Sequence, residues 1–197
     1  MKAKSRESFR KEKKEFLGKK DKSRKSSIDV LIKPVLDRIN SMEDYYTTSS
    51  CSGRIILVEK DDAGNKKGAR WLFVSHEHVA FPKFYSALRT IGQRDVWLKQ
   101  ESFILHVCCF DLAAAESLMQ RVDSLGLRRS GMVSFSRKII VELIGHEQLE
   151  AIVAKAGKIA CPEAYLKMLL SEANKKLRKN KKKIKKLLSL FPSGKQP

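Results

Sequence analysis

The stretch that decides the fold is Tyr45–Glu59, which reads Tyr-Tyr-Thr-Thr-Ser-Ser-Cys-Ser-Gly-Arg-Ile-Ile-Leu-Val-Glu. Its small hydroxyl and thiol side chains end at Gly53 and Arg54, and a β-branched apolar run follows at once. This order predicts a polar loop delivered to one end of a buried strand. Such a loop presents hydroxyl and amide donors, and one guanidinium, to an anionic ligand. The alternative is an ordinary Ser-rich turn before a strand.

The positive charge of the chain is concentrated at its two ends. The 197 residues carry a formal net charge of +19, of which residues 1–28 hold +8 and residues 171–197 hold +9. The 142 residues between them therefore carry only +2. Clustered Lys and Arg side chains suit a polyanion, because each cation placed on a phosphate releases a condensed counterion. The charge therefore favours a nucleic acid partner, with a solvated, Lys-rich surface of the thermophile kind as the alternative.

The composition is that of a globular chain. Hydrophobic residues make up 42% and aromatic residues 8%, which is enough for one sizeable core or two small ones. No apolar run approaches the roughly 18 residues of a membrane span, and no signal peptide shape is present. We therefore expect a cytoplasmic protein with no membrane partner. The four cysteines lack C-x-x-C spacing, which argues against a zinc site or a disulfide framework.

Hydrophobic periodicity and turn residues predict a mixed α/β fold, with a β-sheet body of about six strands, flanking helices and a long C-terminal basic helix. The predicted helices span residues 5–20, 28–39, 81–89, 112–125 and 162–190. The predicted strands span residues 54–60, 69–75, 132–136 and 138–143, and the most apolar strand, 103–110, lies within the segment 96–110. The predicted domains are a basic N-terminal extension (residues 1–28), an α/β body (residues 29–161) and a basic helix packed on the body (residues 162–197).

The start of the second predicted helix carries two signals. Ser26 and Asp29 have capping-box spacing, so we interpret Asp29 as a helix cap. Pro34 either kinks this helix or marks its first turn.

Several familiar catalytic sites are absent from the sequence. No G-x-G-x-x-G motif follows a predicted strand and no Walker loop occurs, so a Rossmann-type nucleotide fold is not expected. His76 and His78 end a predicted strand on one face, but no third metal ligand is evident, so no metal is expected. A base or hydrogen-bonding role suits His76 better, with a satisfied histidine at the sheet edge as the alternative. We interpret His106, inside the most apolar strand, as a core residue.

The long C-terminal helix has two unlike sides. Its apolar seam consists of Leu166, Leu170, Ala173, Leu177, Ile184, Leu188 and Phe191. Its other side is covered with lysines, which include Lys175, Lys179, Lys182 and Lys183. An apolar seam with a basic back predicts a helix docked on the body and presented to a polyanion. A helix that lies on a membrane surface or binds a partner protein is the rival interpretation.

These segments together make the chain resemble the wybutosine-synthesis methyltransferase family, the third enzyme of the tRNA wybutosine pathway. The resemblance spans roughly residues 21 to 191. Its carriers are the segments 21–29, 47–54, 71–76, 103–107 and 126–131, and the helix with Glu172, Ala173, Asn174 and Asn180. The chain departs from the family at Leu127, where Phe is common, and in the loop from His146 to Lys158.

The resemblance implies a transfer of methyl from S-adenosylmethionine to N4 of a tricyclic wyosine-type guanosine, next to the anticodon of phenylalanine tRNA. It also implies a mixed α/β fold that is not the doubly wound methyltransferase sheet, with residues 29–161 as the catalytic body. Methyl transfer from a sulfonium needs in-line placement, so positioning supplies most of the acceleration. The anticodon arm is the expected partner. No DNA partner is expected, and the sequence fixes no oligomeric state.

The site residues expected from this resemblance fall into three groups. The cofactor and base pocket consists of Ser49, Ser50, Cys51, Ser52, Arg54 and Trp71, and His76 is the candidate base. Arg54 would take the methionine carboxylate or a phosphate, and Trp71 would stack on a flat ring, unless it is a core aromatic. The tRNA-binding group consists of Arg24, Lys25, Arg128, Arg129, Ser130, Lys175, Lys179, Lys182 and Lys183.

Two other classes of function remain open at this stage. A non-catalytic RNA-binding or assembly protein would use the same basic surface, with the Ser/Thr stretch as a phosphate-binding loop. An enzyme acting on a small phosphate compound would need no RNA. Binding of S-adenosylmethionine separates the methyltransferase from the RNA-binding module.

Overall fold

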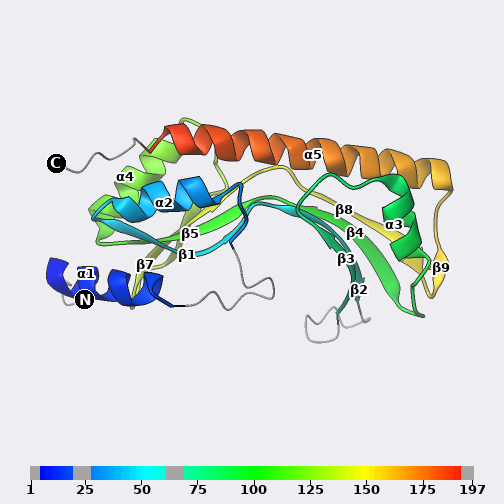
Figure 1. Ribbon diagram of the computed structural model, residues 1–197, viewed down its shortest axis with the longest axis horizontal. Coiled ribbons are helices and arrows are strands. Elements are labelled where there is room, and N and C mark those ends of the chain that lie inside the picture. The colour runs from blue at the N-terminus through cyan, green and yellow to red at the C-terminus, as the bar shows by residue number, and fades with distance from the viewer. Residues whose placement is uncertain (1–4, 20–27, 61–68, 192–197) are drawn as a thin grey trace. The chain divides into compact units, whose positions relative to one another are not determined.

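The computed structural model describes residues 5–19, 28–60 and 69–191, and its contacts divide the chain into two compact units (Figure 1). Unit 1 consists of residues 1–52, 103–146 and 181–197, and unit 2 consists of residues 53–102 and 147–180. Each unit is assembled from strands and helices that are distant in the sequence. No helix in the described part of the chain has the length and apolarity to cross a bilayer.

Unit 1 is built on a four-stranded antiparallel sheet with the order β1-β5-β7-β6. These strands are Tyr45–Cys51 (β1), Ile104–Cys109 (β5), Ile139–Ile144 (β7) and Gly131–Ser134 (β6). Its helices are Arg6–Leu17 (α1), Lys33–Ser41 (α2), Leu112–Asp123 (α4) and the last turns of Glu163–Ser189 (α5). Asp111 caps α4 by accepting a hydrogen bond of 2.8 Å from the Ala114 amide, as the Asp before an apolar helix predicts.

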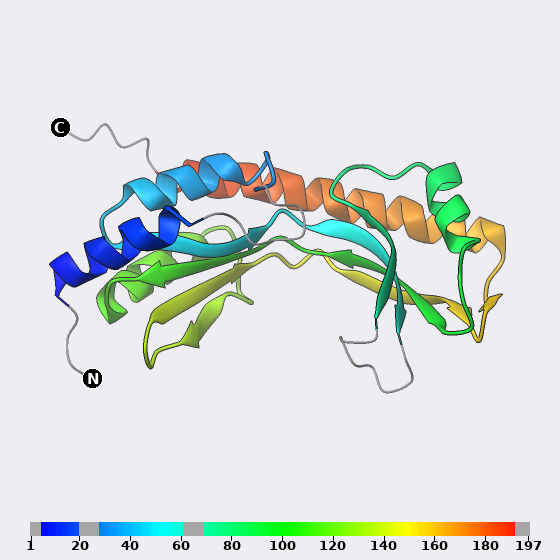
Figure 2. The same cartoon turned by 60° about the horizontal axis from the view of Figure 1, so that its bottom comes forward.

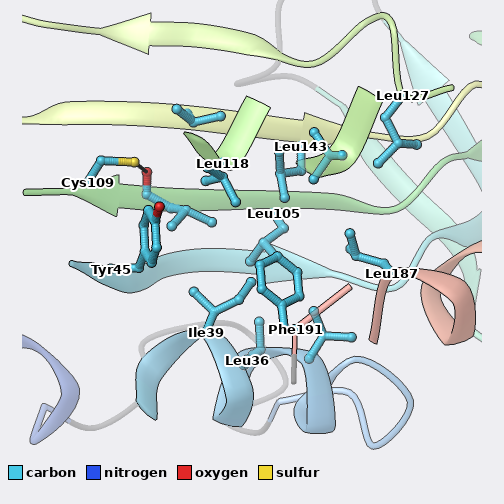
Figure 3. Packing of buried hydrophobic residues seen from close by; sticks show 14 of the residues in the cluster. Leu36, Ile39, Tyr45, Leu105, Cys109, Leu118, Leu127, Leu143, Leu187 and Phe191 are labelled. Atoms are coloured by element: carbon cyan, nitrogen blue, oxygen red, sulfur yellow. Dashed lines mark hydrogen bonds between the residues drawn. The ribbon is translucent and has the colours of Figure 1, made fainter. Parts of the chain in front are cut away.

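The core of unit 1 lies between one face of this sheet and the helices α2, α4 and α5. Figure 3 shows Leu105 and Leu143 of the sheet facing Leu118 of α4, with Leu36 of α2 and Leu187 of α5 in the same cluster. Every second residue of β5 and β7 enters this core, as the period of a strand requires. The other face is covered at one end by α1, where the Phe9 ring lies 5.4 Å from the Tyr46 ring. Figure 1 shows α1 and α2 on opposite sides of these strands.

Unit 2 is built on a five-stranded antiparallel sheet with the order β3-β2-β4-β8-β9. These strands are Arg70–Ser75 (β3), Arg54–Lys60 (β2), Asp95–Glu101 (β4), Leu149–Lys155 (β8) and Lys158–Ile159 (β9). The helix Phe81–Leu88 (α3) and the first part of α5 cover one face of this sheet (Figure 2). Buried residues Phe84 and Leu88 of α3, Leu166 and Leu177 of α5, and Leu57 of β2 form this second core.

The mixed α/β class and the long C-terminal helix are confirmed, and neither sheet is a parallel Rossmann sheet. The described residues contain nine strands, against a predicted number of about six. Strands β8 and β9 occupy the stretch that was predicted to be a loop between His146 and Lys158, because the alternation in β8 is weak, with several exposed positions. The segment 96–110, in which the strand 103–110 was predicted, contains two strands, β4 and β5.

The interpretation of Tyr45–Ser52 as a loop is wrong, because Tyr45–Cys51 is a strand that pairs with β5. A run of Ser and Thr has the composition of a loop, but hydroxyl side chains also suit a strand with one polar face. Pro34 lies in the first turn of α2 and does not kink it. The cap assigned to Asp29 is also wrong: its carboxylate binds Ser52, and α2 begins at Lys33 without a side-chain cap. Ser26, its capping-box partner, lies outside the described residues.

One ion pair in unit 2, between a buried carboxylate and an exposed arginine, makes folding stability depend on pH. The Glu59 side chain is 4% exposed, and Arg70 donates to its carboxylate from Nε at 2.6 Å and from Nη2 at 3.0 Å. The Gly92 amide donates to the same carboxylate. The Arg70 hydrogen bond, against the effect of burial, holds the pKa of Glu59 below its ordinary value of 4.5.

We expect Glu59→Gln to lower the free energy of unfolding at pH 7 by about 1.5–3 kcal/mol, because it removes the charge from this network. A carboxyl with a lowered folded-state pKa stabilises above 4.5, and the stability is lost as the pH falls through the folded-state pKa. The deficit of the variant should therefore shrink below pH 4.5 in urea titrations. Exposed Asp123→Asn is the control, and a deficit that stays constant down to pH 2 would contradict the account.

Candidate functional site

The hydroxyl strand β1 presents its side chains through a β-bulge. Tyr46 pairs with Cys108 and Thr47 with Val107, but Ser49 and not Thr48 lies opposite His106. One extra residue in a strand reverses the facing of every residue after it. Ser49 therefore shares the face of Tyr46, away from the core of unit 1.

A polar row crosses three strands at this register. Ser49 of β1, His106 of β5 and Glu142 of β7 are directly paired across the sheet. The Ser49 Oγ lies 2.7 Å from His106 Nδ1, and His106 Nε2 lies 2.8 Å from Glu142 Oε2. The side chains of His106 and Glu142 are 30% and 24% exposed. The interpretation of His106 as a core residue is therefore wrong: its neighbours Leu105 and Val107 enter the core, and His106 faces the other way.

Two side chains hold β1 within unit 1, one at Thr47 inside the strand and one at Ser52 just after it. Asn40 of α2 accepts from the Thr47 amide at 2.8 Å and donates to the Thr47 hydroxyl at 3.0 Å, just before the bulge. Asp29 accepts from the Ser52 amide at 3.1 Å and from the Ser52 hydroxyl at 2.8 Å, just after the strand. Ser52 is 2% exposed. The structure thus gives Ser52 a buried anchoring contact, and Ser49 the exposed hydroxyl.

In unit 2, the predicted residues Arg54 and Trp71 are brought together. The Arg54 guanidinium carbon lies 4.5 Å from the centre of the Trp71 ring, and Arg54 Nε donates to Glu101 Oε2 at 2.6 Å. The Trp71 side chain is on β3 and 37% exposed, so it is not a core aromatic. A guanidinium stacked on an indole and held by a carboxylate is pre-oriented. Arg54 keeps further N–H donors beyond the one that binds Glu101.

His76 follows β3 and is half-buried. Its Nδ1 lies 3.0 Å from the Gly53 carbonyl oxygen, and because a carbonyl only accepts, Nδ1 carries the hydrogen. In the neutral ring the lone pair is then on Nε2. The loop after His76 is held by Asn174 of α5, which accepts from the Val79 amide at 2.9 Å and donates to the Val79 carbonyl at 2.9 Å.

The predicted tRNA-binding residues lie on several elements. Arg128 and Arg129 are exposed in the turn between α4 and β6, where the Ser130 hydroxyl accepts from the Ile144 amide at 3.1 Å. On α5, Lys175, Lys179 and Lys182 are exposed and Lys183 is half-buried. Lys175 Nζ lies 3.4 Å from Glu172 Oε2, and Lys179 Nζ lies 3.9 Å from Glu147 Oε1. Arg24 and Lys25 lie outside the described residues.

The predicted pocket is thus distributed over both units. Ser49, Ser50, Cys51 and Ser52 belong to unit 1, and Arg54, Trp71 and His76 belong to unit 2. The contacts described within each unit connect Ser49 with His106, Ser52 with Asp29, and Arg54 with Trp71. Ser50 and Cys51 are half-buried at the end of β1.

Sequence reasoning missed His106, Glu142 and the anchoring role of Asp29. A signal existed for the first two: His106 alternates with Leu105 and Val107, and Glu142 alternates with Val141 and Leu143. A polar residue at the odd position of an apolar strand belongs to the face opposite the core. The contact between Asp29 and Ser52 joins residues 23 positions apart, and no local pattern reports it.

Comparison with known proteins agrees with this architecture. The family model described as Methyltransferase TYW3 matches residues 4–193. The chain belongs to the TYW3 methyltransferase family. A Pyrococcus horikoshii relative of the TYW3 family, named tRNA(Phe) 7-((3-amino-3-carboxypropyl)-4-demethylwyosine(37)-N(4))-methyltransferase 1, is 36% identical over 93% of this chain and 94% of its own length.

Further relatives extend the TYW3 match across organisms. An Archaeoglobus fulgidus protein that is also named as an N(4)-methyltransferase of this kind is 37% identical over 95% of this chain and 93% of its own length. The human tRNA wybutosine-synthesizing protein 3 homolog is 35% identical over 89% of this chain and 69% of its own length. A solved structure of a Pyrococcus horikoshii protein superposes with a TM-score of 0.86 at 35% identity, over 96% of this chain and 98% of that one.

The two hydrogen bonds between the Asn174 side chain and the Val79 backbone should slow hydrogen exchange in the segment after His76. Asn174→Ala removes both hydrogen bonds to the Val79 backbone, so we expect the Val79 amide to exchange its hydrogen about tenfold faster or more. Asn174→Asp keeps an acceptor for that amide and should give an intermediate rate. Hydrogen exchange measured by NMR reports both, with the Leu57 amide of β2 as the internal control. Equal Val79 rates in all three proteins would show that Asn174 does not hold this segment.

Proposed function

We propose that this protein transfers a methyl group from S-adenosylmethionine to N4 of a tricyclic wyosine-type guanosine in phenylalanine tRNA. The observation that carries the proposal is the match, over more than nine tenths of both chains, to relatives that are named for N(4)-methylation of this base in tRNA(Phe). The residues of this chain supply a compatible set of groups. The Ser49 hydroxyl, the Arg54 guanidinium and the Trp71 ring lie on strands of the two sheets, which are more rigid supports than loops.

The donor set suits a sulfonium nucleoside. S-adenosylmethionine supplies an electrophilic methyl on a positively charged sulfur, next to a carboxylate, an ammonium group, ribose hydroxyls and adenine. Arg54 is proposed to bind the carboxylate with the N–H donors that Glu101 leaves available. Trp71 is proposed to stack on adenine or on the tricyclic base. Ser50, Cys51 and Ser52, at the end of β1 in unit 1, are proposed to contact the cofactor or the target base.

The tRNA is proposed to bind through the basic residues. Arg128, Arg129 and Ser130 would contact the substrate backbone or its aminocarboxypropyl tail. Arg24, Lys25 and the exposed lysines of α5 would contact phosphates of the anticodon arm. Bases of an anticodon loop are already partly unstacked, so little energy is needed to present the target base.

His76 is one candidate for accepting the proton of the target nitrogen. Because Nδ1 donates to the Gly53 carbonyl, the lone pair on Nε2 makes the neutral ring a possible base. The competing function, an RNA-binding protein without catalysis, needs neither this base nor a methyl donor. Titration with S-adenosylmethionine therefore separates the two functions.

We expect calorimetric titration of the purified protein with S-adenosylmethionine to show saturable binding. Arg54→Ala should weaken it by about 10- to 100-fold, because a hydrogen bond to a charged group contributes about 1.5–3 kcal/mol. Arg89→Ala, which removes an exposed arginine at the end of α3, is the matched control. Unchanged binding of S-adenosylmethionine by Arg54→Ala would indicate that Arg54 contacts the tRNA and not the cofactor. No binding, even with undermodified tRNA present, would exclude the methyltransferase function.

The lysines of α5 give a prediction about salt dependence. Each phosphate contact contributes about 0.7–0.9 to the slope of log K against log salt concentration. We expect the double variant Lys175→Ala/Lys179→Ala to reduce that slope by about 1.4–1.8, measured by fluorescence anisotropy with labelled phenylalanine tRNA. The control is the double variant Lys155→Ala/Lys158→Ala on β8 and β9. An equal reduction in both variants would indicate non-specific attraction in place of a defined binding face.

A further inference from the structure

The polar row of Ser49, His106 and Glu142 has a fixed direction of hydrogen bonding. The Glu142 carboxylate only accepts, so His106 Nε2 must donate to it across 2.8 Å. In the neutral imidazole Nδ1 then carries the lone pair. The Ser49 hydroxyl, 2.7 Å from that nitrogen, must donate its hydrogen to it. The hydrogen of Ser49 is thereby committed to His106, and the exposed oxygen of Ser49 offers only lone pairs to a ligand.

The sheet holds this row rigidly. The three residues face one another on adjacent strands, and the bulge held by Asn40 puts Ser49 in register with His106. Two positions farther along, Cys51, Ile104 and Ile144 form the next cross-strand row on the same face, and all three are half-buried. An exposed acceptor beside a partly apolar floor suits a flat heterocycle that carries an N–H group.

The same face adjoins the basic turn of unit 1. Gly131 of β6 pairs with Glu142 across the sheet, and a Cβ at Gly131 would meet no atom within 4 Å. Exposed Arg128 and Arg129 precede it by three and two residues. A nucleotide base over the polar row would therefore have cations of the same unit near its phosphates.

We propose that Ser49, His106 and Glu142 form a proton relay that accepts the hydrogen of the target ring nitrogen during methyl transfer, an inference that rests on the function proposed above. Ser49 contacts the substrate N–H and is the catalytic residue. His106 and Glu142 act through Ser49 and are positioning residues. The relay also distinguishes substrate from product, because a methylated nitrogen has no hydrogen to donate to the Ser49 oxygen.

The ring nitrogen forms a bond to the methyl carbon, the carbon–sulfur bond of the sulfonium donor breaks, and its electron pair stays on sulfur. The N–H proton passes to the Ser49 oxygen while the Ser49 proton passes to His106 Nδ1. The resulting imidazolium is stabilised by the Glu142 carboxylate and later releases its proton to water. No further reactant is required.

The partner of His106 Nε2 is a carboxylate, which stabilises the charged ring that proton uptake creates. The relay therefore assigns the proton to His106.

The test measures methyl transfer to phenylalanine tRNA that carries the unmethylated tricyclic base. We expect Ser49→Ala and His106→Gln to lower kcat by about 100-fold or more, and Glu142→Gln by about tenfold. KM for the tRNA should stay within about twofold, because the relay acts in the transition state. Ser49→Thr retains the hydroxyl and should restore most of the rate. Ser134→Ala, whose hydroxyl donates to the Lys138 carbonyl on the same sheet, is the control, and thermal unfolding checks that each variant is folded.

A spectroscopic measurement tests the relay without turnover. Nitrogen-15 NMR of labelled histidines should show neutral His106 with hydrogen on Nε2 and none on Nδ1, and this preference should weaken in Glu142→Leu. The opposite tautomer in the wild type would overturn the relay even in an active enzyme.

The kinetic outcomes separate the relay from the proposed function. Full kcat in His106→Gln, or a loss confined to KM, would overturn the relay and leave the methyltransferase intact. A loss of kcat in His76→Gln alone would identify His76 as the residue that accepts the proton. A wild-type protein that binds the tRNA without methylating it would overturn the proposed function, and the relay with it.

Discussion

One extra residue in β1 is the constraint on which the candidate site of unit 1 depends. Without the bulge at Thr48, the regular register would place Thr48 opposite His106 and turn Ser49 toward the core. Asn40 stabilises the bulge by binding both the amide and the hydroxyl of Thr47. Because the helix α2 that carries Asn40 packs on the core face through Leu36 and Ile39, the packing of a helix on one face sets what the opposite face presents.

The same principle operates in unit 2 with other groups. There Asn174, on the buried side of α5, forms hydrogen bonds with the Val79 backbone. Trp71 of strand β3 lies against the Arg54 guanidinium. Buried polar groups that are fully hydrogen-bonded specify one conformation, and Asn174 satisfies both atoms of its amide. In each unit a helix is held to its sheet by apolar contacts, and one amide side chain of that helix, half-buried Asn40 or buried Asn174, fixes a backbone segment near the predicted site residues.

The sequence predicted those elements whose signals are local. Strand β2 was predicted with its observed bounds, and the bounds of α3 and α4 were predicted to within two residues. The buried residues Leu166, Leu170 and Leu177 of α5 were also predicted. Alternation, caps and helical spacing involve residues that are close in the sequence. The strand β1 was not predicted, since its hydroxyl residues have the composition of a loop. The bulge, the pairing of His106 with Glu142 and the contact of Asp29 with Ser52 join distant residues. Such pairings follow from the topology of the sheet, which a single sequence does not display.

The most direct test of the central claim is the transfer of an isotopically labelled methyl group. The protein is incubated with S-adenosylmethionine labelled on its methyl carbon and with phenylalanine tRNA that carries the unmethylated tricyclic base, and the digested nucleosides are analysed by mass spectrometry. The account predicts one labelled methyl group on N4 of the tricyclic nucleoside and none on the four standard nucleosides. Tight binding of this tRNA without any labelled product would contradict it and would identify an RNA-binding protein.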